Sequence, residues 1–342
     1  MSKRVTIREV AQEAGVSTAT VSYVLNNKAS ESIMPETIAR VNAAIGKLGY
    51  VPNLSARALR YRKSNLIGVV IPQTEPGKEF MFSNPFYGDF LSAAEYTART
   101  RGYRLLISGT NAGQSYVEIA QNYGLDAIII LGIYPTDDID AYKEAKIPLV
   151  LVDCYRNDHF FHSIGTNDRH GGYLATQCLI RHGHRRIAFI SGSVEEAGVN
   201  QKRLLGYRDA LDETGIPYDQ DIVFPGNVGY EHGMETALDI VRNHPDVTAV
   251  FVTADIMAVG VIKGFADAGL SVPGDVSVVG FDDVFIANIS SPSLTTIRQN
   301  IKEKGKTAVE LALGAIDDPF GPKRDVIIPL EVIERASVRD IR

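Results

Sequence analysis

Three polar residues lie where helical or apolar segments begin or end, and their types suit the binding of hydroxyl groups. Asp153 ends the apolar run Leu149–Val152, and Asp282 follows the run Val276–Gly280. Arg203 opens a stretch with helical spacing. Carboxylates accept hydrogen bonds from hydroxyls and an arginine donates in a fork, so these residues together suit a neutral polyol such as a sugar.

The elements that must position these residues are short apolar runs that alternate with helical stretches. The runs are Leu66–Ile71, Tyr103–Ser108, Ala127–Leu131, Leu149–Val152, Ile187–Ser191, Val250–Thr253 and Val276–Gly280. Uninterrupted β-branched runs separated by helices are typical of parallel sheets covered on both faces. The sequence therefore predicts a doubly wound α/β body, in which ligands bind beyond the carboxyl ends of the strands.

A structural interpretation of the same polar residues stays open. Asp153 and Asp282 are equally suited to cap loops, and Arg203 to form a salt bridge between two parts of the body. Asp255, which also follows an apolar run, is expected to be a helix N-cap instead of a ligand contact.

The first 63 residues are basic although the whole chain is acidic. They hold ten lysines and arginines against four carboxylates, a net charge of +6. Because the 342-residue chain carries −6 in total, the remaining 279 residues carry −12. A basic region on an acidic body is expected when only that region meets phosphate groups.

Start and stop signals divide this basic region into short helices. Thr6-Ile7-Arg8-Glu9 has the spacing of a capping box, and Gly15 suits the left-handed end of the first helix. Ser17 offers an N-cap for a second helix from Thr18 to about Leu25, and a third helix ends at Gly49. Two short helices across a tight turn, followed by a third, predict a helix-turn-helix domain.

The second helix has a polar face that is free of acid. Its apolar side is formed by Val21, Val24 and Leu25. The opposite side carries small or polar residues, namely Thr18, Ala19, Ser22, Tyr23 and Asn26. Such side chains let a helix lie close to phosphates and base edges. The alternative is a small helical bundle that only mediates protein contacts.

A short segment links this domain to the body. After Gly49 the chain is expected to be extended over 50–53, and 54–60 has room for about two helical turns. A helix of that length is marginal alone. The cations of this region, including Arg60, suggest that the segment forms its helix on the surface of DNA. Burial of Leu59 against the body is the alternative.

The N-terminal motifs resemble those of a known family. They lie at Thr6–Ala11, Ala14–Ser17, Thr20–Asn26, Gly49–Asn53 and Ala56–Leu59. These motifs are similar to those in the DNA-binding head of the lactose/galactose repressor family of bacterial transcription regulators. The resemblance implies a helix-turn-helix domain over 1–49, a hinge helix over 50–64 and an effector-binding and dimerisation domain over 65–342.

The resemblance also implies DNA contacts. It places Thr18, Ala19 and Tyr23 where family members read bases in the major groove. It places four further residues near the DNA backbone: Thr6, Ser17, Ser22 and Asn26. Leu59 is expected to wedge between base pairs in the minor groove, with Arg60 reaching toward the groove floor.

The body resembles periplasmic sugar-binding proteins. Sequence motifs typical of the family lie at Gly171–Ala175, Arg181–Ala188, Asp255–Gly260, Val278–Asp283 and Leu294–Ile297. The resemblance implies two lobes, one over about 65–165 and 299–329 and the other over about 166–298 and 330–342. It implies crossings between them near Gly165, Gln299 and Pro329 and an effector cleft between the lobes.

Asp153, Arg203 and Asp282 resemble the family's effector contacts in this cleft. Ala254 stands where sugar-responsive members often have Asn, and Val228 where many have a stacking aromatic.

The segment 74–83 is longer than usual for the family. Phe82, Phe86 and Tyr87 are therefore expected to stack on the effector from the other lobe.

Composition excludes several classes of protein. With 45% hydrophobic and 22% charged residues the chain is globular, and its two cysteines cannot build a disulfide framework. No run approaches the roughly 18 apolar residues that span a bilayer. A cytoplasmic location, with no membrane partner, is expected.

The sequence contains no complete motif for catalysis or metal binding. Gly305-Lys306-Thr307 resembles part of a phosphate loop, but Asn300 occupies the position of the required first glycine. No Gly-x-Gly-x-x-Gly follows a strand, and the pairs His159/His162 and His182/His184 lack a ligand set with metal spacing. No cofactor, metal or catalytic residue is predicted, and the protein is not expected to be an enzyme.

The sequence therefore predicts a ligand-controlled transcription regulator, most simply a repressor, that binds a pseudo-palindromic operator on the nucleoid as a homodimer. One small reading helix needs a second half-site for useful specificity. The expected effector is a sugar or sugar derivative. Two other functions stay open: a sugar-binding module with a vestigial DNA-binding head, and an enzyme that acts on a sugar.

Overall fold

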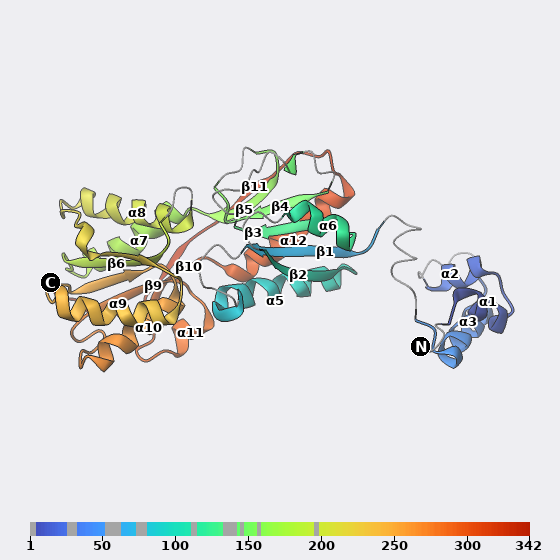
Figure 1. Cartoon of the computed structure of the whole chain (residues 1–342), viewed down its shortest axis with the longest axis horizontal. Helices are drawn as coiled ribbons and strands as arrows, with labels where there is room; N and C mark the ends of the chain where they lie inside the picture. The colour runs from blue at the N-terminus through green and yellow to red at the C-terminus, as the bar shows by residue number, and fades with distance from the viewer. Residues whose placement is uncertain are drawn as a thin grey trace. The chain divides into compact units, whose positions relative to one another are not determined.

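The computed structural model describes residues 5–25, 33–51, 63–72, 81–110, 115–132, 142–143, 147–155, 159–194 and 198–342. The chain divides into two compact units, Met1–Ser64 and Asn65–Arg342 (Figure 1). Each unit has its own apolar core. The N-terminal unit is helical and the C-terminal unit, called the body below, is α/β.

The described part of the N-terminal unit is built from α1 (Ile7–Ala14), α2 (Thr18–Leu25) and α3 (Pro35–Leu48). The predicted capping box starts α1, because Thr6 N donates to Glu9 Oε2 at 2.6 Å and Thr6 Oγ1 accepts from Glu9 N at 3.4 Å. Gly15 and Gly49 end α1 and α3 in the left-handed region, with φ of 64° and 60°. The apolar faces of the helices enclose a core that includes Val10, Val21 and Val41.

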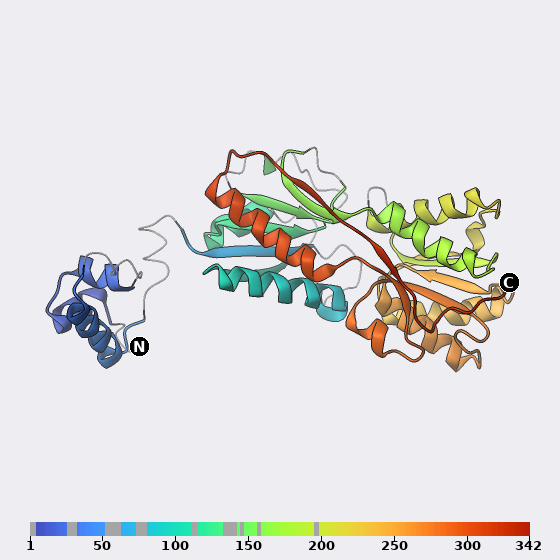
Figure 2. The same cartoon turned by 180° about the vertical axis from the view of Figure 1, so that it is seen from behind.

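The first sheet of the body has the strand order β11-β5-β4-β3-β1-β2, and its paired strands are parallel. The strands are β1 (Leu66–Pro72), β2 (Arg104–Thr110), β3 (Ala127–Leu131), β4 (Leu149–Val152), β5 (His162–Thr166) and β11 (Asp325–Ile328). Helices α5 (Pro85–Thr100) and α12 (Ile301–Asp317) lie side by side on one face (Figure 2). Helix α6 (Tyr116–Tyr123) packs on the other face.

The second sheet has the order β12-β10-β9-β8-β6-β7, in which only the β10–β12 pair among the described strands is antiparallel. The strands are β6 (Ile187–Gly192), β7 (Val223–Gly226), β8 (Ala249–Val252), β9 (Ser277–Asp282), β10 (Thr295–Arg298) and β12 (Glu331–Ile333). Helices α7 (Asp168–Arg181) and α8 (Val199–Glu213) cover one face, and α9 (Tyr230–Asn243) and α10 (Asp255–Asp267) cover the other. The short helix α11 (Phe285–Ile289) follows β9.

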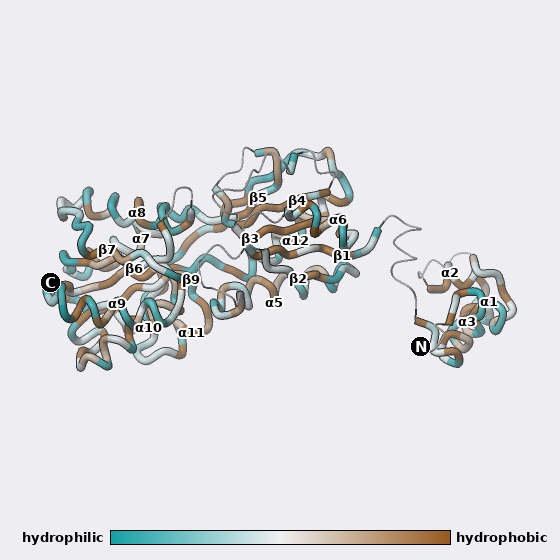
Figure 3. The backbone as a smooth tube through the Cα atoms, in the orientation of Figure 1, coloured by the Kyte–Doolittle hydropathy of each residue, from teal (hydrophilic) through white to brown (hydrophobic). Residues whose placement is uncertain are grey.

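The central strands β3, β4 and β8 are apolar along their whole length (Figure 3). Every residue of β3, β4, β6 and β8 is buried. Because helices cover both faces, these strands need no alternation of polar and apolar residues. This explains why continuous apolar runs predict their positions.

The predicted runs all fall on strands, with ends that differ by one or two residues. The sequence did not predict β5, β7, β10, β11 and β12. Of these, β7, β11 and β12 lie at sheet edges, and their partly exposed residues form no apolar run. In β10 the buried Thr295 and Thr296 replace the expected apolar residues.

The chain passes between the two sheets at residues 166–168, 298–301 and 328–331. The last of these segments is the extended red connection from β11 to β12 in Figures 1 and 2. Because these segments converge, the ends of β4, β5 and β9 lie close to one another. Within the described residues, no helix has the length and apolar character to cross a membrane.

Glycines allow the helices of the second sheet to pack closely. A Cβ added to Gly172 in α7 would lie 2.1 Å from the carbonyl oxygen of Arg203 in α8. A Cβ on Gly206 would lie 1.8 Å from the carbonyl oxygen of Arg169. Since backbone atoms cannot yield as a flexible side chain does, these glycines set the position of α8 and of Arg203.

We expect the substitution Gly172→Ala to lower the free energy of unfolding of the body by about 1–3 kcal/mol, because α8 must move away from α7. Urea unfolding would measure this change. The matched control is Gly314→Ala in α12, where an added Cβ meets nothing within 4 Å. Ala should stabilise that helix by about 0.5–1 kcal/mol. Similar effects of the two substitutions would contradict the packing argument.

Candidate functional site

Helix α2 presents an exposed face on the N-terminal unit. Thr18, Ala19 and Tyr23 are exposed, and Tyr23 retains 52% of its accessible surface. Ser17 precedes the helix, and its Oγ accepts a hydrogen bond from Thr20 N at 3.1 Å, as the predicted N-cap requires. The exposed face therefore combines a methyl group, a hydroxyl and a phenol.

The placement of Ser22 on this exposed face is wrong. Ser22 is buried, with 8% exposure. It lies three residues before Leu25 and so about 60° from it around the helix axis, at the edge of the apolar side. Three other predicted DNA contacts, Asn26, Leu59 and Arg60, lie outside the described residues.

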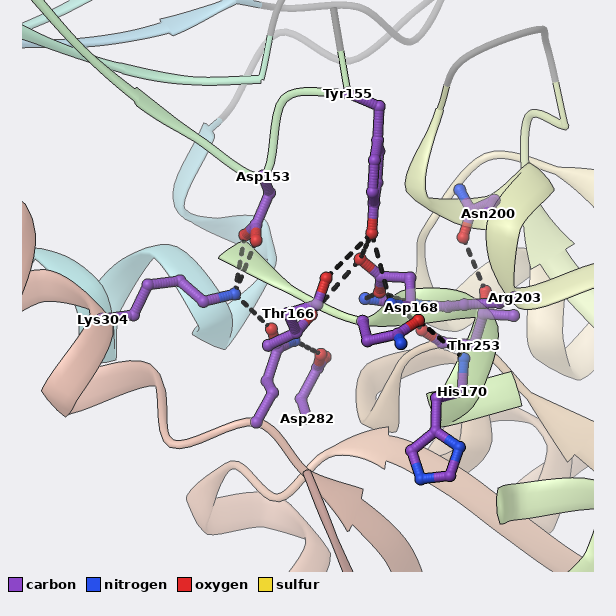
Figure 4. A network of polar contacts seen from close by, with 12 residues as sticks. Asp153, Tyr155, Thr166, Asp168, His170, Asn200, Arg203, Thr253, Asp282 and Lys304 are labelled. Carbon is purple, nitrogen blue, oxygen red and sulfur yellow. Dashed lines mark hydrogen bonds and ion pairs between the residues drawn. The ribbon is translucent and has the colours of Figure 1, made fainter. Parts of the chain in front are cut away.

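A polar network joins the two sheets of the body around Lys304 (Figure 4). Lys304 lies in the first turn and a half of α12 and is fully buried. Its Nζ donates to Asp153 Oδ1 at 2.7 Å, to Asp153 Oδ2 at 2.9 Å and to Gln299 Oε1 at 2.6 Å. Gln299 Nε2 in turn donates to Asp282 Oδ1 at 2.6 Å. Polar contacts therefore run without a break from Asp153, after β4, to Asp282, at the end of β9.

Arg203 belongs to a second part of this network. Its Nε donates to Asp168 Oδ1 at 2.7 Å, and its Nη1 donates to the carbonyl oxygen of Thr253 at 2.7 Å. The guanidinium carbon lies 3.6 Å from the ring centroid of Phe281. Tyr155, which follows β4, donates from its hydroxyl to Asp168 Oδ2 at 2.5 Å. This contact ties a loop of the first sheet to the start of α7 beside the second sheet.

One of the predicted aromatic residues is in contact with the network. The ring centroid of Phe86 lies 5.6 Å from Lys304 Nζ. Tyr87 packs edge-on against Phe86 with 5.5 Å between the ring centroids. Phe82, in the short 3-10 helix Met81–Ser83, is 59% exposed.

The backbone is unusual at four residues of this region. Asp153, Asp282, Asp283 and Asn300 have positive φ, of 52°, 121°, 59° and 43°. Asp and Asn enter this region more readily than other residues with a Cβ, because their short polar side chains can bond locally. The side chains that meet between the sheets thus stand on turns that abruptly redirect the chain.

Comparisons with known proteins identify the family. A family model of bacterial regulatory proteins, lacI family, matches residues 6–53, and a model of a periplasmic binding protein-like domain matches residues 176–338. The chain is 31% identical to the HTH-type transcriptional repressor PurR of Vibrio atlanticus (strain LGP32) over 98% of this chain and 99% of that one. The chain belongs to the LacI family. It is a DNA-binding transcription regulator.

Solved structures of transcription regulators share the whole architecture. The lac repressor dimer bound to operator and the anti-inducer ONPF matches with a TM-score of 0.83 and 27% identity, over 98% of this chain and 100% of that one. The complex of the transcriptional regulator CelR with cellobiose matches with a TM-score of 0.71 and 29% identity, over the same shares of the two chains. The resemblance and the fold predicted from the motifs are confirmed.

Two details of the sequence analysis of this LacI-family regulator are wrong. Arg203 does not open a helix, because α8 begins at Val199 and Arg203 lies in its second turn. Asp255 is not an N-cap, since Ala254 takes that position. Asp255 is fully buried as the first residue of α10, where it accepts from Val284 N at 3.0 Å and from Thr296 Oγ1 at 2.6 Å.

The sequence analysis missed Lys304, Gln299, Asp168 and Tyr155. A signal for Lys304 was present, because it falls three residues after Ile301 and four before Ala308, on the buried stripe of α12. A lysine on an apolar stripe is rarely buried without a partner. The other three residues carry no comparable signal, since polar residues in loops and at helix starts are ordinary. No group of three metal-ligating side chains gathers anywhere in the described parts of the chain.

Burial changes the protonation of the carboxyl groups. It raises the pKa of Asp282 to about 7, although the charge of Arg203 and the Gln299 hydrogen bond act against this rise. It also raises the pKa of Asp153, against the opposing charge of Lys304. The pKa of Asp255 lies well above its usual range because of burial and the nearby charge of Asp282. The LacI-family site therefore holds one carboxyl group, that of Asp282, whose pKa lies near neutral pH.

The raised pKa of Asp282 has a consequence for stability. In the unfolded chain this carboxyl ionises near pH 4, whereas in the folded protein it keeps its proton up to about pH 7. The folded state thus binds more protons between these values, and its stability falls as the pH rises through this window, by at most about 1.4 kcal/mol per pH unit. We expect the loss to disappear in Asp282→Asn. Melting temperatures of both proteins from pH 4 to 8 would test this, and a difference that does not vary with pH would contradict it.

Proposed function

We propose that this LacI-family regulator represses transcription by binding a pseudo-palindromic operator as a homodimer, and that a sugar or sugar derivative bound between its lobes changes this affinity. The observation that carries the proposal is the exposed, acid-free face of α2 in a basic N-terminal unit. The same chain continues into a body whose buried acceptors lie at the ends of strands of both sheets. One chain thus combines a surface for phosphates with a site for hydroxyl groups.

On DNA, α2 would lie in the major groove. Thr18 and Tyr23 can donate to or accept from base edges, and the methyl group of Ala19 suits a thymine methyl. Thr6 and Ser17 stand at the starts of α1 and α2, where they would position the helices on the phosphate backbone. Ser22 is buried and would not lie on this DNA-facing surface. Asn26 is retained from the sequence alone.

The linker would add a second contact. Leu59 would enter the minor groove between base pairs and Arg60 would follow it, which costs unstacking energy but exposes more surface for contact. These residues are retained on the sequence resemblance.

The effector would bind where Asp153, Arg203 and Asp282 gather between the sheets. Phe86 lies beside Lys304 and would supply an apolar ring, and Phe82 and Tyr87 lie nearby in the chain. The complex of CelR with cellobiose supports a sugar as the class of effector. The domain boundaries that follow are a DNA-binding domain over 1–49, a hinge over 50–64 and two lobes within 65–342.

Control by the effector would be a shift between two lobe arrangements. The network from Asp153 to Asp282 bridges both sheets, so a ligand that contacts both carboxylates favours one separation of the lobes. That choice would alter the spacing of the two hinge segments in a homodimer and hence the entry of Leu59 into DNA. The operator-bound dimer of the lac repressor supports the dimer. Binding to chromosomal DNA would place the protein on the nucleoid in the cytoplasm.

The test of this function is the selection of fragmented genomic DNA by the full-length protein at near-physiological salt, followed by sequencing of the bound fragments. Recovery of an inverted repeat supports the operator, and the genes beside it suggest which sugars to test. Retention without a motif that vanishes on addition of modest salt would reflect only phosphate attraction and would leave the protein as a sugar-binding module.

Tyr23→Ala should weaken binding to the recovered operator by about tenfold or more, because it removes a base contact. Its effect on random DNA should stay within about twofold. The exposed Tyr96 in α5, with 62% of its surface accessible, provides the matched control Tyr96→Ala. Fluorescence anisotropy would measure the affinity of each variant for the operator. An equal loss of operator affinity in Tyr23→Ala and Tyr96→Ala would contradict the proposal that α2 contacts the bases.

Leu59→Ala should weaken operator binding more than binding to random DNA of equal length. The reason is that the wedge acts only on a duplex that the head has already positioned. Anisotropy titrations against both duplexes at one salt concentration would measure the ratio. An equal loss of affinity for the operator and for random DNA would contradict the insertion of Leu59 between base pairs.

A further inference from the structure

The ammonium group of Lys304 is wholly engaged within the protein. A lysine has three N–H donors. Those of Lys304 meet three acceptor atoms, the two carboxylate oxygens of Asp153 and Oε1 of Gln299, at 2.6–2.9 Å. The side chain has no accessible surface. Lys304 therefore acts on a ligand only through the residues that it holds.

Arg203 is also engaged within the protein, through three of its five N–H donors. It forms an ion pair with the buried Asp168 through Nε and Nη2, each at 2.7 Å from Oδ1, and donates from Nη1 to the carbonyl oxygen of Thr253. Its flat face is covered by the ring of Phe281. With 8% of its side chain exposed, Arg203 has little freedom to turn toward an anion.

The carboxylates of the network, in contrast, keep acceptor capacity. An ionised carboxylate has about four lone-pair sites. Asp153 accepts two bonds from Lys304, and its side chain retains 16% exposure. Asp282 accepts one side-chain bond, from Gln299, among the described residues, and its carboxyl group, with a pKa of about 7, keeps oxygen lone pairs that can accept in either protonation state. Among the described residues, a ligand between the lobes therefore meets carboxyl oxygens that accept hydrogen bonds, while Lys304 and Arg203 behind them are already paired with Asp153 and Asp168.

We propose that Lys304 determines the chemical class of the effector, because it holds Asp153 as an oriented, charged acceptor and gives no donor to the ligand itself. Building on the proposed function, this inference assigns the site to a polyol that donates hydrogen bonds and carries no phosphate or carboxylate group. A phosphorylated or acidic sugar would bring further acceptor oxygens and a negative charge to Asp153 and Asp282. Desolvating that charge without a cation is costly.

Lys202 is the cation that most directly challenges this assignment. Its ammonium lies 5.5 Å from the ring centroid of Tyr155, beside Asp168. In contrast to Lys304 it is only partly buried. If the effector carries an anionic group, Lys202 is the residue that would bind it, so Lys202→Gln serves as the matched control for substitutions of Lys304.

Matched pairs of sugars test the assignment on the full-length protein. The probes are ribose and ribose 5-phosphate, glucose and glucose 6-phosphate, glucose and glucuronate, and cellobiose and cellobiose 6-phosphate. Thermal shift followed by isothermal titration calorimetry measures each affinity, with equal inorganic phosphate as the reference for anions that bind to the basic N-terminal unit. We expect at least one neutral sugar to bind about tenfold or more tightly than its charged counterpart, and Lys202→Gln to leave this ratio unchanged.

The outcomes separate this inference from the proposed function. Tighter binding of a phosphorylated or acidic member, lost in Lys202→Gln, overturns the inference and leaves the sugar-controlled regulator intact. If no member of any pair binds, the sugar effector itself fails and the inference fails with it.

Substitution of Lys304 tests its role as a positioning residue. In Lys304→Met the pKa values of Asp153 and Asp282 lose an opposing charge and rise. We expect the affinity for the neutral sugar to fall by about tenfold at pH 6.5 and to recover part of this loss at pH 8.5, as the carboxyl groups ionise. A purely structural role predicts a ratio of variant to wild-type affinity that does not change with pH.

The double variant Asp153→Asn/Lys304→Met guards against misfolding of the single variant. The amide introduced by Asp153→Asn carries no charge and needs no cation beside it, so the double variant should fold. The part of the pH dependence of sugar affinity that arises from Asp153 should then vanish. A double variant with the same pH dependence as Lys304→Met would show that Asp153 is not the group that Lys304 controls, which would overturn the inference.

Discussion

The removal of carboxyl groups from water where the two sheets meet is the constraint on which the arrangement of the body depends. A buried carboxylate without a partner costs several kcal/mol, so each must find a cation or a donor. Asp168 finds Arg203, and Asp153 finds Lys304. Among the described residues the side chain of Asp282 is hydrogen-bonded only by the amide of Gln299, and its carboxyl group stays protonated to about pH 7. Each of these ion pairs lies within one lobe, and the hydrogen bonds from Gln299 to Asp282 and from Tyr155 to Asp168 connect the lobes.

Strands that are buried on both faces could be predicted from the sequence, because burial alone makes them continuous apolar runs. The runs that form β3 and β4 coincide with the strands because helices cover both faces. In β5, by contrast, buried and partly exposed residues alternate over only five positions, and β10 buries threonines that hydrogen-bond to distant residues. Such strands are stabilised by partners far along the chain, which a local pattern does not reveal. The helices of the N-terminal unit were predictable because caps and stops are local signals.

The same distinction applies to the candidate site. Asp153 and Asp282 were recognisable because the ends of apolar runs mark the edge of a sheet where ligands bind. The partners of these carboxyl groups were not, since Lys304 lies 151 residues from Asp153 in the sequence. The burial of Ser22 was missed for a related reason: a small hydroxyl side chain fits either side of a helix, and only the packing of the other helices decides between them.

The positive φ angles of Asp153, Asp282 and Asn300 restrict how this site can change during evolution or design. Few residue types other than Gly, Asn and Asp tolerate such backbone angles. The acceptors are thus almost fixed by the path of the chain, whatever the ligand. Position 304 lies in a regular helix and has no such restriction. New ligand preferences would therefore arise more readily by exchanging the residue behind the carboxylates than by exchanging the carboxylates themselves.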